Sequence, residues 1–197
     1  MSDLNLYSVN WQDGMLITQQ HLKDQEKYFE DLARWYALDV SDRFGLVRKN
    51  FSGKPALSLN LSMSGDRLLV EVVRCQAITP DGSIIEINES NCSPVRADTS
   101  IEASVVPVYI GIDPSAKKQV GQPDPQEDLP RVPYLMNNYF LTLGQRPNLP
   151  EGRFLQIAEL NIDGNEVTPS TSYYPPCLSI NADERLTQKA TDFRNRL

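Results

Sequence analysis

Apolar residues alternate with polar ones through the middle of this chain, and this period of two restricts the fold more than any other feature. It begins at Leu57, Leu59 and Leu61, and β-branched and aliphatic segments recur up to residue 167. A two-residue period places alternate side chains on opposite faces of a β-strand. We therefore predict strands at residues 56–61, 67–78, 83–87, 105–112, 139–143, 154–162 and 166–167.

Tight turns separate two pairs of these predicted strands. Residues 79–82 read TPDG and residues 162–165 read IDGN, with Pro and Gly at the positions that turns prefer. Both turns indicate neighbouring antiparallel strands. Strands of this number and length form a sandwich or a barrel. We predict a mainly β protein built as an antiparallel β-sandwich.

Residues 113–133 interrupt the alternation with five prolines and few apolar side chains. Proline has no backbone N–H to contribute to a strand ladder. We predict a long exposed loop over these residues. A loop of this length inside a compact domain is either a docking element or a mobile excursion.

The segment 18–36 has a helical period instead. It contains neither Gly nor Pro, and Thr18 is positioned as its N-cap. Four apolar residues share one face of this amphipathic helix: Leu22, Phe29, Leu32 and Tyr36. Tyr28 and Trp35 widen that face, so we expect the helix to pack against more than one surface, of which the second could belong to another chain.

A second helical stripe lies at the carboxy-terminal end, where Asn181 is a plausible N-cap. Its apolar members are spaced as in a coiled-coil seam: Leu186, Ala190, Phe193 and Leu197. No terminating Gly or Pro follows, so we expect an amino-terminal part of a longer protein. The stripe belongs either to the first turns of an oligomeric helical neck or to a helix packed back on the sandwich.

Charge and composition favour a cytoplasmic protein. The formal net charge is −7 and no cluster of Lys and Arg occurs, which argues against binding to nucleic acid or to anionic membrane. No apolar run approaches the roughly 18 residues that cross a bilayer, and the amino terminus lacks a signal-peptide pattern. We expect no direct membrane insertion. Cys75, Cys92 and Cys177 fit a reducing compartment, so we expect three free thiols.

The residues offer little for catalysis. His21 is the one histidine, no cysteine pair has zinc-ligand spacing, and the nucleotide-binding and nucleophile-elbow motifs are absent. We expect no enzyme activity, no cofactor and no metal site. A hydrolase that uses a pair of carboxylates stays open as an alternative, although no Asp or Glu pair stands out.

Three blocks of sequence carry a family resemblance. They are VNWQDGML at residues 9–16 with Gln20-His21-Leu22 after it, AITPDG at residues 77–82, and YPPCLSI at residues 174–180. In composition, order and spacing, these blocks resemble the amino-terminal part of the type VI secretion system baseplate subunit TssK. The resemblance extends over essentially the whole chain.

This resemblance implies a shoulder domain, a β-sandwich related to those of phage receptor-binding proteins, followed by a helical neck and a head. It implies a homotrimer that docks onto the wedge subunits TssF and TssG in the cytoplasmic baseplate, while the missing carboxy-terminal part reaches the membrane complex. We accordingly divide the chain into an extended lead-in at 1–17, the shoulder at 18–180 and the start of the neck at 181–197.

Two sets of residues are candidates for these contacts. The neck stripe named above is the candidate for oligomerisation. The candidates for partner binding are the large side chains before and at the start of the first helix: Leu6, Tyr7, Trp11, Met15, Leu16 and His21. Their alternative role is structural, with the lead-in covering an edge of the sandwich and His21 as a hydrogen-bonded packing residue.

A different class of function also stays open. A phage-like receptor-binding or carbohydrate-binding sandwich would use exposed aromatic residues, and Tyr134, Tyr173 and Tyr174 are the candidates for it.

Overall fold

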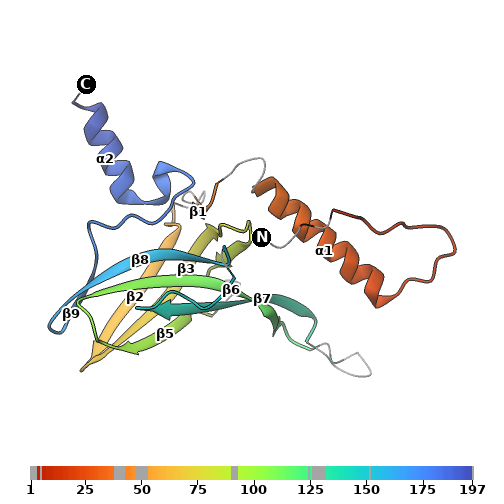
Figure 1. The fold of residues 1–197 in the computed structure, drawn as a ribbon, viewed down its shortest axis with the longest axis horizontal. Helices are drawn as coiled ribbons and strands as arrows, with labels where there is room; N and C mark the ends of the chain where they lie inside the picture. Colours follow the sequence, from red (N-terminus) through yellow and green to blue (C-terminus); the bar gives the residue numbers. More distant parts are fainter. Residues whose placement is uncertain are drawn as a thin grey trace.

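The computed structural model describes residues 4, 6–37, 43–47, 53–89, 93–123, 125, 132–150 and 152–196. Within these ranges nine strands form two antiparallel sheets, with one α-helix before them and another after them (Figure 1). The predicted mainly β fold is confirmed.

The first sheet is organised around one long strand, β3 (Arg67–Ile78). Four other strands pair with it: β1 (Gly45–Leu46), β2 (Leu57–Ser64), β4 (Ile84–Ile87) and β5 (Val95–Ser100). The predicted turn at residues 79–82 joins β3 to β4, and Gly82 has a φ of 80° there. The amide of Gly82 donates to the carbonyl oxygen of Thr79 at 2.9 Å.

The second sheet has the strand order β7-β6-β8-β9. Its members are β6 (Val105–Val120), β7 (Tyr134–Leu143), β8 (Phe154–Asp163) and β9 (Glu166–Pro169). The predicted hairpin at residues 162–165 joins β8 to β9, with Asp163 paired to Glu166.

The core lies between the two sheets, and a β-bulge in β3 adjusts its pattern. Ser58 pairs with Arg74 and Leu59 with Val72, so Val73 has no opposite residue in β2. A bulge of this kind shifts the alternation by one residue. The buried apolar residues of β3 are therefore Leu68, Val70 and Val72 before the bulge, and Cys75 and Ala77 after it, and the side chain of Arg74 is buried beside the bulge. Residues from the other sheet complete the core: Val106, Val108, Ile110, Ile112, Leu143, Leu155, Ile157 and Leu160.

The predicted loop at 113–133 is wrong for its first part, because β6 continues to Val120 and β7 begins at Tyr134. The register shifts between Asp113 and Lys117, and this irregular step accommodates the proline at position 114. Pairing then resumes from Lys117 with Asn137 to Val120 with Tyr134. The β6 side of this hairpin extension is mostly polar, reading KKQ at residues 117–119, so a hydrophobic pattern could not reveal it.

Two strands were missed from the sequence. In β5, half-buried Val95, Ala97 and Thr99 alternate with exposed Arg96 and Asp98. The alternation is present in β5, but its inward side chains are small and its outward ones are charged. The segment therefore gives a weak hydrophobic signal in the sequence. The strand β1 is only two residues long, too short to show any period.

Gly45 in β1 allows a close approach to the Pro-Pro-Cys block at residues 175–177. Its φ is 127°, and a Cβ there would lie 2.4 Å from the carbonyl carbon of Pro176. The amide of Leu46 donates to the carbonyl oxygen of Pro176 at 2.8 Å, and the amide of Leu178 donates back to Leu46 at 2.8 Å. The third resemblance block therefore extends the first sheet beside β1.

Both α-helices lie where the sequence predicts them, but only the first has the predicted N-cap residue. The first, α1 (Gln19–Trp35), has the predicted N-cap Thr18. The second, α2 (Glu184–Arg194), is capped by Asp183, whose side chain accepts from the amide of Arg185. The predicted N-cap Asn181 is wrong, because it lies inside a preceding 3-10 turn, Ile180–Ala182.

Candidate partner-binding site

The first helix presents its apolar face to solvent, contrary to the packing we predicted. Three of its four predicted members, Leu22, Phe29 and Tyr36, are 58%, 59% and 58% exposed, and the fourth, Leu32, is half-buried. Asp31, in contrast, is only 4% exposed. The helical period correctly identified which side chains share a face. The docked face, however, is the polar one, and the physical reason lies in the ionic groups that it meets.

Asp81, in the turn between β3 and β4, is the centre of this docking contact. Its carboxylate accepts from Nη2 of Arg34 at 3.1 Å and forms an ion pair with Nε of Arg153 at 2.7 Å. Nε of Arg34 also donates to the main-chain oxygen of Asp81 at 3.0 Å. One carboxylate thus joins α1 to the start of β8 through two arginines. We call Lys27, Asp31, Arg34, Asp81 and Arg153 the polar junction.

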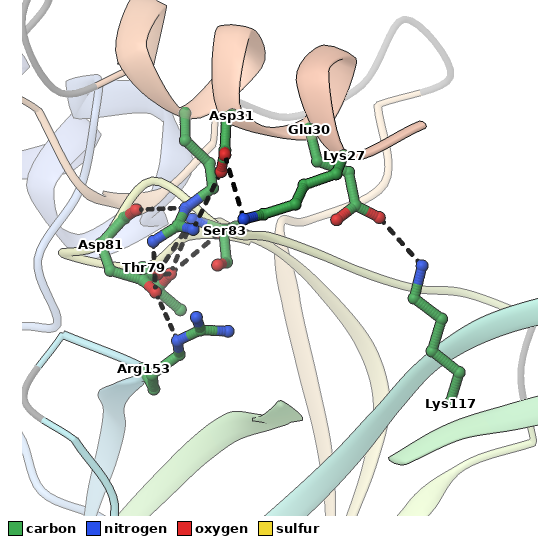
Figure 2. Close-up of polar contacts among 9 residues, drawn as sticks. Lys27, Glu30, Asp31, Thr79, Asp81, Ser83, Lys117 and Arg153 are labelled. Carbon is green, nitrogen blue, oxygen red and sulfur yellow. Dashed lines mark hydrogen bonds and ion pairs between the residues drawn. The ribbon is translucent and has the colours of Figure 1, made fainter. Parts of the chain in front are cut away.

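The turn itself orients the Asp81 carboxylate. Oδ1 of Asp81 accepts from Oγ1 of Thr79 at 2.7 Å and from the amide of Ser83 at 3.1 Å. Thr79 is fully buried, so this end of the turn is anchored in the sandwich. Figure 2 shows the carboxylate of Asp81 between the helix and Arg153. The second resemblance block therefore supplies the residue that holds α1.

Ion pairs within α1 and one lysine of β6 complete the polar face of the helix. Asp31 lies 3.6 Å from Nη1 of Arg34 and 4.0 Å from Nζ of Lys27. Nearer the start of the helix, Nζ of Lys117 on β6 donates to Glu26 at 3.0 Å and to Glu30 at 2.9 Å. These carboxylates raise the pKa of Lys117, with the hydrogen bond to Glu30 as the main cause. The hairpin extension of β6 thus supports α1 from a second position (Figure 2).

The lead-in runs along α1 and not across an edge of the sandwich (Figure 1). Nε1 of Trp11 donates to Oε1 of Gln25 at 3.2 Å, and the Trp11 ring meets the His21 ring edge-on with centroids 6.2 Å apart. Nδ1 of His21 accepts from the amide of Thr18 at 3.3 Å in a capping box. His21 therefore orders the start of the helix and fixes the lead-in to it.

The structure brings most of the six candidate partner-binding residues together. Tyr7, Met15 and His21 line one cleft of about 460 Å³ with Tyr28, and Trp11 contacts His21. Tyr7 and Leu16 are 85% and 81% exposed, and Leu6 is also exposed. The surface continues onto α1, whose apolar face the sequence allowed to contact another chain but whose residues were not among the six candidates. We define the α1 apolar surface by its exposed members: Leu6, Tyr7, Trp11, Leu16, Ile17, Leu22, Phe29 and Tyr36.

The second helix projects away from the sandwich (Figure 1). None of its described residues is buried. Leu186 is half-buried and Ala190 is exposed, while Phe193 is 67% exposed. Leu197, the last member of the predicted stripe, lies outside the described residues. The alternative in which the whole helix packs back on the sandwich therefore does not hold for Ala190 and Phe193.

One arginine attaches the start of α2 to the sandwich. Nη1 of Arg185 donates to the main-chain oxygen of Ser170 at 2.9 Å, and Nη2 donates to Asp183 at 2.7 Å. Its guanidinium carbon lies 4.8 Å from the centroid of the Tyr174 ring, and Nζ of Lys189 lies 4.4 Å from the same centroid. These contacts set the direction in which α2 leaves the sandwich.

The three tyrosines considered for carbohydrate binding differ in exposure and in contacts. Tyr134 is exposed on β7. The hydroxyl of Tyr173 donates to the main-chain oxygen of Gln156 at 2.9 Å, and burial raises the pKa of Tyr173 to about 12. The ring of Tyr174 is covered by Arg185 and Lys189.

The two cysteines that the structure describes are free thiols, as predicted. Burial raises the pKa of Cys75 to about 12 and that of Cys177 to about 11. Cys92 lies outside the described residues. Among the residues that the structure describes, no group of three or more His, Cys, Asp or Glu side chains could hold a metal ion. No described helix is long and apolar enough to cross a membrane.

Comparison with known proteins finds chains of similar fold but no match by sequence. No protein-family model matches this chain, and no curated protein matches its sequence. A chain in the cryo-electron microscopy structure of the type VI secretion system TssK-TssF-TssG baseplate subcomplex superposes with a TM-score of 0.68 at 17% identity, covering 95% of this chain and 68% of that chain.

Two further structures superpose similarly. The crystal structure of TssK gives a TM-score of 0.66 at 17% identity over 96% of this chain and 46% of that chain. A structure of the type VI secretion system baseplate complex gives 0.64 at 17% identity over 96% of this chain and 65% of that chain. This chain therefore has a fold found in TssK and in baseplate structures, and it spans between 46% and 68% of the length of those chains.

Proposed function

We propose that this chain is the shoulder part of a TssK-like baseplate subunit that docks onto the wedge subunits TssF and TssG. The observation that carries the proposal is the α1 apolar surface, which the polar junction holds away from the sandwich. Eight large apolar side chains on one helix and its lead-in remain exposed. A group of exposed apolar residues of this kind marks a protein interface.

The superposed structures support the choice of partner. One of them is a complex of TssK with TssF and TssG, and another is a baseplate complex. In this proposal the protein acts by surface complementarity and performs no chemistry. It works in the cytoplasm, at the inner face of the inner membrane.

The same proposal assigns the ends of the chain. Residues 1–17 are the lead-in of the docking surface, residues 18–180 are the shoulder, and residues 181–197 begin a helical neck. The exposed Phe193 and Ala190 support a neck that packs around a three-fold axis in the longer protein. Modules beyond the neck would reach the membrane complex, so that one trimer links the baseplate to the envelope.

Co-expression with TssF and TssG from the same secretion cluster tests the docking. A tagged form of this chain should recover both subunits as one species in size-exclusion chromatography with light scattering. Phe29→Asp should abolish recovery, because it places a charge within the exposed apolar surface. The matched control is Tyr134→Asp, which alters an exposed aromatic residue on β7 and should leave recovery unchanged. Equal recovery by both variants would contradict the assigned surface.

Native mass spectrometry tests the neck. In the full-length protein, Phe193→Asp should lower the fraction of trimer while the circular dichroism of the sandwich stays unchanged. An unaltered trimer fraction would reject this role for Phe193.

A further inference from the structure

A second candidate interaction surface lies at the edge of the first sheet formed by β2, and it shares no lining residue with the polar junction. A groove of about 570 Å³ opens there between β2, β8 and the segment that leads into α2. Leu57, Leu59 and Leu61 line one side of it, and Ile157, Tyr173 and Pro175 line the other. This groove is independent of the α1 apolar surface and of the function proposed for it.

The leucines of β2 are less well covered than their neighbours. Leu57, Leu59 and Leu61 are only half-buried, although they pack against the hydrophobic core. Leu68 and Val70 on the adjacent strand β3 have no exposed surface at all. The core of the sandwich is therefore incompletely covered along β2, and added apolar side chains there would gain burial.

The strand β9 of the second sheet lies near β2, but the two strands do not pair in the part of the chain that the structure describes. Among the described residues, β2 pairs with β3 alone, and no backbone hydrogen bond is made to its other edge. Its eight residues, Leu57–Ser64, contain no Pro and no charged side chain. Proteins usually protect an edge strand with such residues or cover it, because an open edge pairs readily with another strand.

The rim of the groove carries more negative than positive charge. The lining residues include three carboxylates, Glu159, Asp183 and Glu184, and one guanidinium, Arg185. That guanidinium already binds Asp183 and the main chain of Ser170. The charge of the rim therefore favours a ligand that brings a Lys or Arg side chain.

We propose that this groove binds an extended segment of a partner protein, which adds to the first sheet as a strand beside β2. Main-chain hydrogen bonds to the open edge provide affinity, and alternate side chains provide specificity. The segment has apolar residues at every second position, directed at the β2 leucines, and a basic residue beside Glu159 at the rim. The charge of the rim selects a basic partner segment over a second copy of β2, which carries no basic residue.

Selection from a displayed library of random nine-residue peptides tests this proposal on the purified chain. The expected result is enrichment of peptides that alternate apolar and polar residues and contain Lys or Arg. A synthetic copy of the most enriched peptide should bind in fluorescence anisotropy and should slow hydrogen exchange at residues 57–64.

Two variants locate the binding. Leu59→Asp should weaken the peptide at least about tenfold, and Glu159→Lys should weaken it severalfold while leaving the sandwich folded, since it changes only the rim. Thermal melts of both variants check folding. Selection without enrichment, or enriched peptides that bind both variants as well as the unmodified chain, would overturn the proposal. Dimerisation of the chain through β2, seen in light scattering and abolished by Leu59→Asp, would also overturn it by assigning the groove to a second copy.

Discussion

Replacing Asp81 by Asn should loosen the first helix from the sandwich, because this one carboxylate joins two arginines from distant parts of the chain. The side chains of Asp81, Arg34 and Arg153 are 13%, 16% and 21% exposed. An asparagine keeps the size of the side chain and keeps an oxygen that can accept from Ser83. It removes the negative charge that both guanidinium groups face.

The expected loss follows from the two contacts. A hydrogen bond between charged groups contributes about 1.5–3 kcal/mol and a neutral one about 1 kcal/mol. Removing one partner of a buried ion pair costs about 3–5 kcal/mol, and the partial exposure of this site lowers that figure. We expect Asp81→Asn to reduce the free energy of unfolding by about 2–3 kcal/mol. For a protein of this length that corresponds to a fall in Tm of about 5–10 °C.

Thermal denaturation followed by circular dichroism measures this effect, and hydrogen exchange at residues 19–35 shows whether α1 is the part released. The matched control is Asp98→Asn, since Asp98 pairs with Arg67 where the two side chains are 49% and 63% exposed. That variant should change stability by less than about 0.5 kcal/mol. Equal Tm values for the two variants would refute the argument that the polar junction holds α1.

Three further predictions concern the sandwich and its attachments. Gly45→Ala should lower the free energy of unfolding by more than about 2 kcal/mol in urea denaturation, because the new Cβ meets Pro176. The control Gly65→Ala has open space around the new Cβ and should cost about 1 kcal/mol. Stability should fall as pH rises from about 9 towards 12, since the unfolded chain releases the Cys75 proton near pH 9 while the folded chain retains it up to a pKa of about 12. Urea midpoints at pH 8 and 10.5 measure this loss, and an equal loss in Cys75→Ala would contradict it. Lys117→Ala should speed hydrogen exchange in the middle turns of α1, around Glu26 and Glu30, but lower Tm by less than about 2 °C. Unchanged exchange there would count against its supporting role.

The strands with inward apolar residues and the position of each helix could be predicted from the sequence, because local periods and caps encode them. Thr18 acts as the N-cap of α1 as expected, and the segment 67–78 is a strand from end to end. The extension of β6 beyond Asp113 could not be predicted in the same way, since residues 117–119 of β6 are polar and their pairing with β7 is made by the backbone.

The orientation of α1 could not be predicted from the sequence for a different reason. A helical period shows which residues share a face, but it does not show which face meets the rest of the protein. Here the choice depends on Arg34 and Asp81, which are 47 residues apart, and on Arg153 beyond them. The Pro-Asp-Gly turn was recognisable, whereas the role of its carboxylate became clear only when its partners were placed around it.

Hydrogen exchange of this chain with and without the TssF–TssG subcomplex from its own secretion cluster tests the proposed function most directly. We predict that residues 6–36 exchange more slowly in the complex, while β5 at residues 95–100 is unchanged. A complex that protects other regions and leaves residues 6–36 unaffected would contradict the assigned surface. Failure to form any complex, also with the full-length protein, would contradict the proposed function itself.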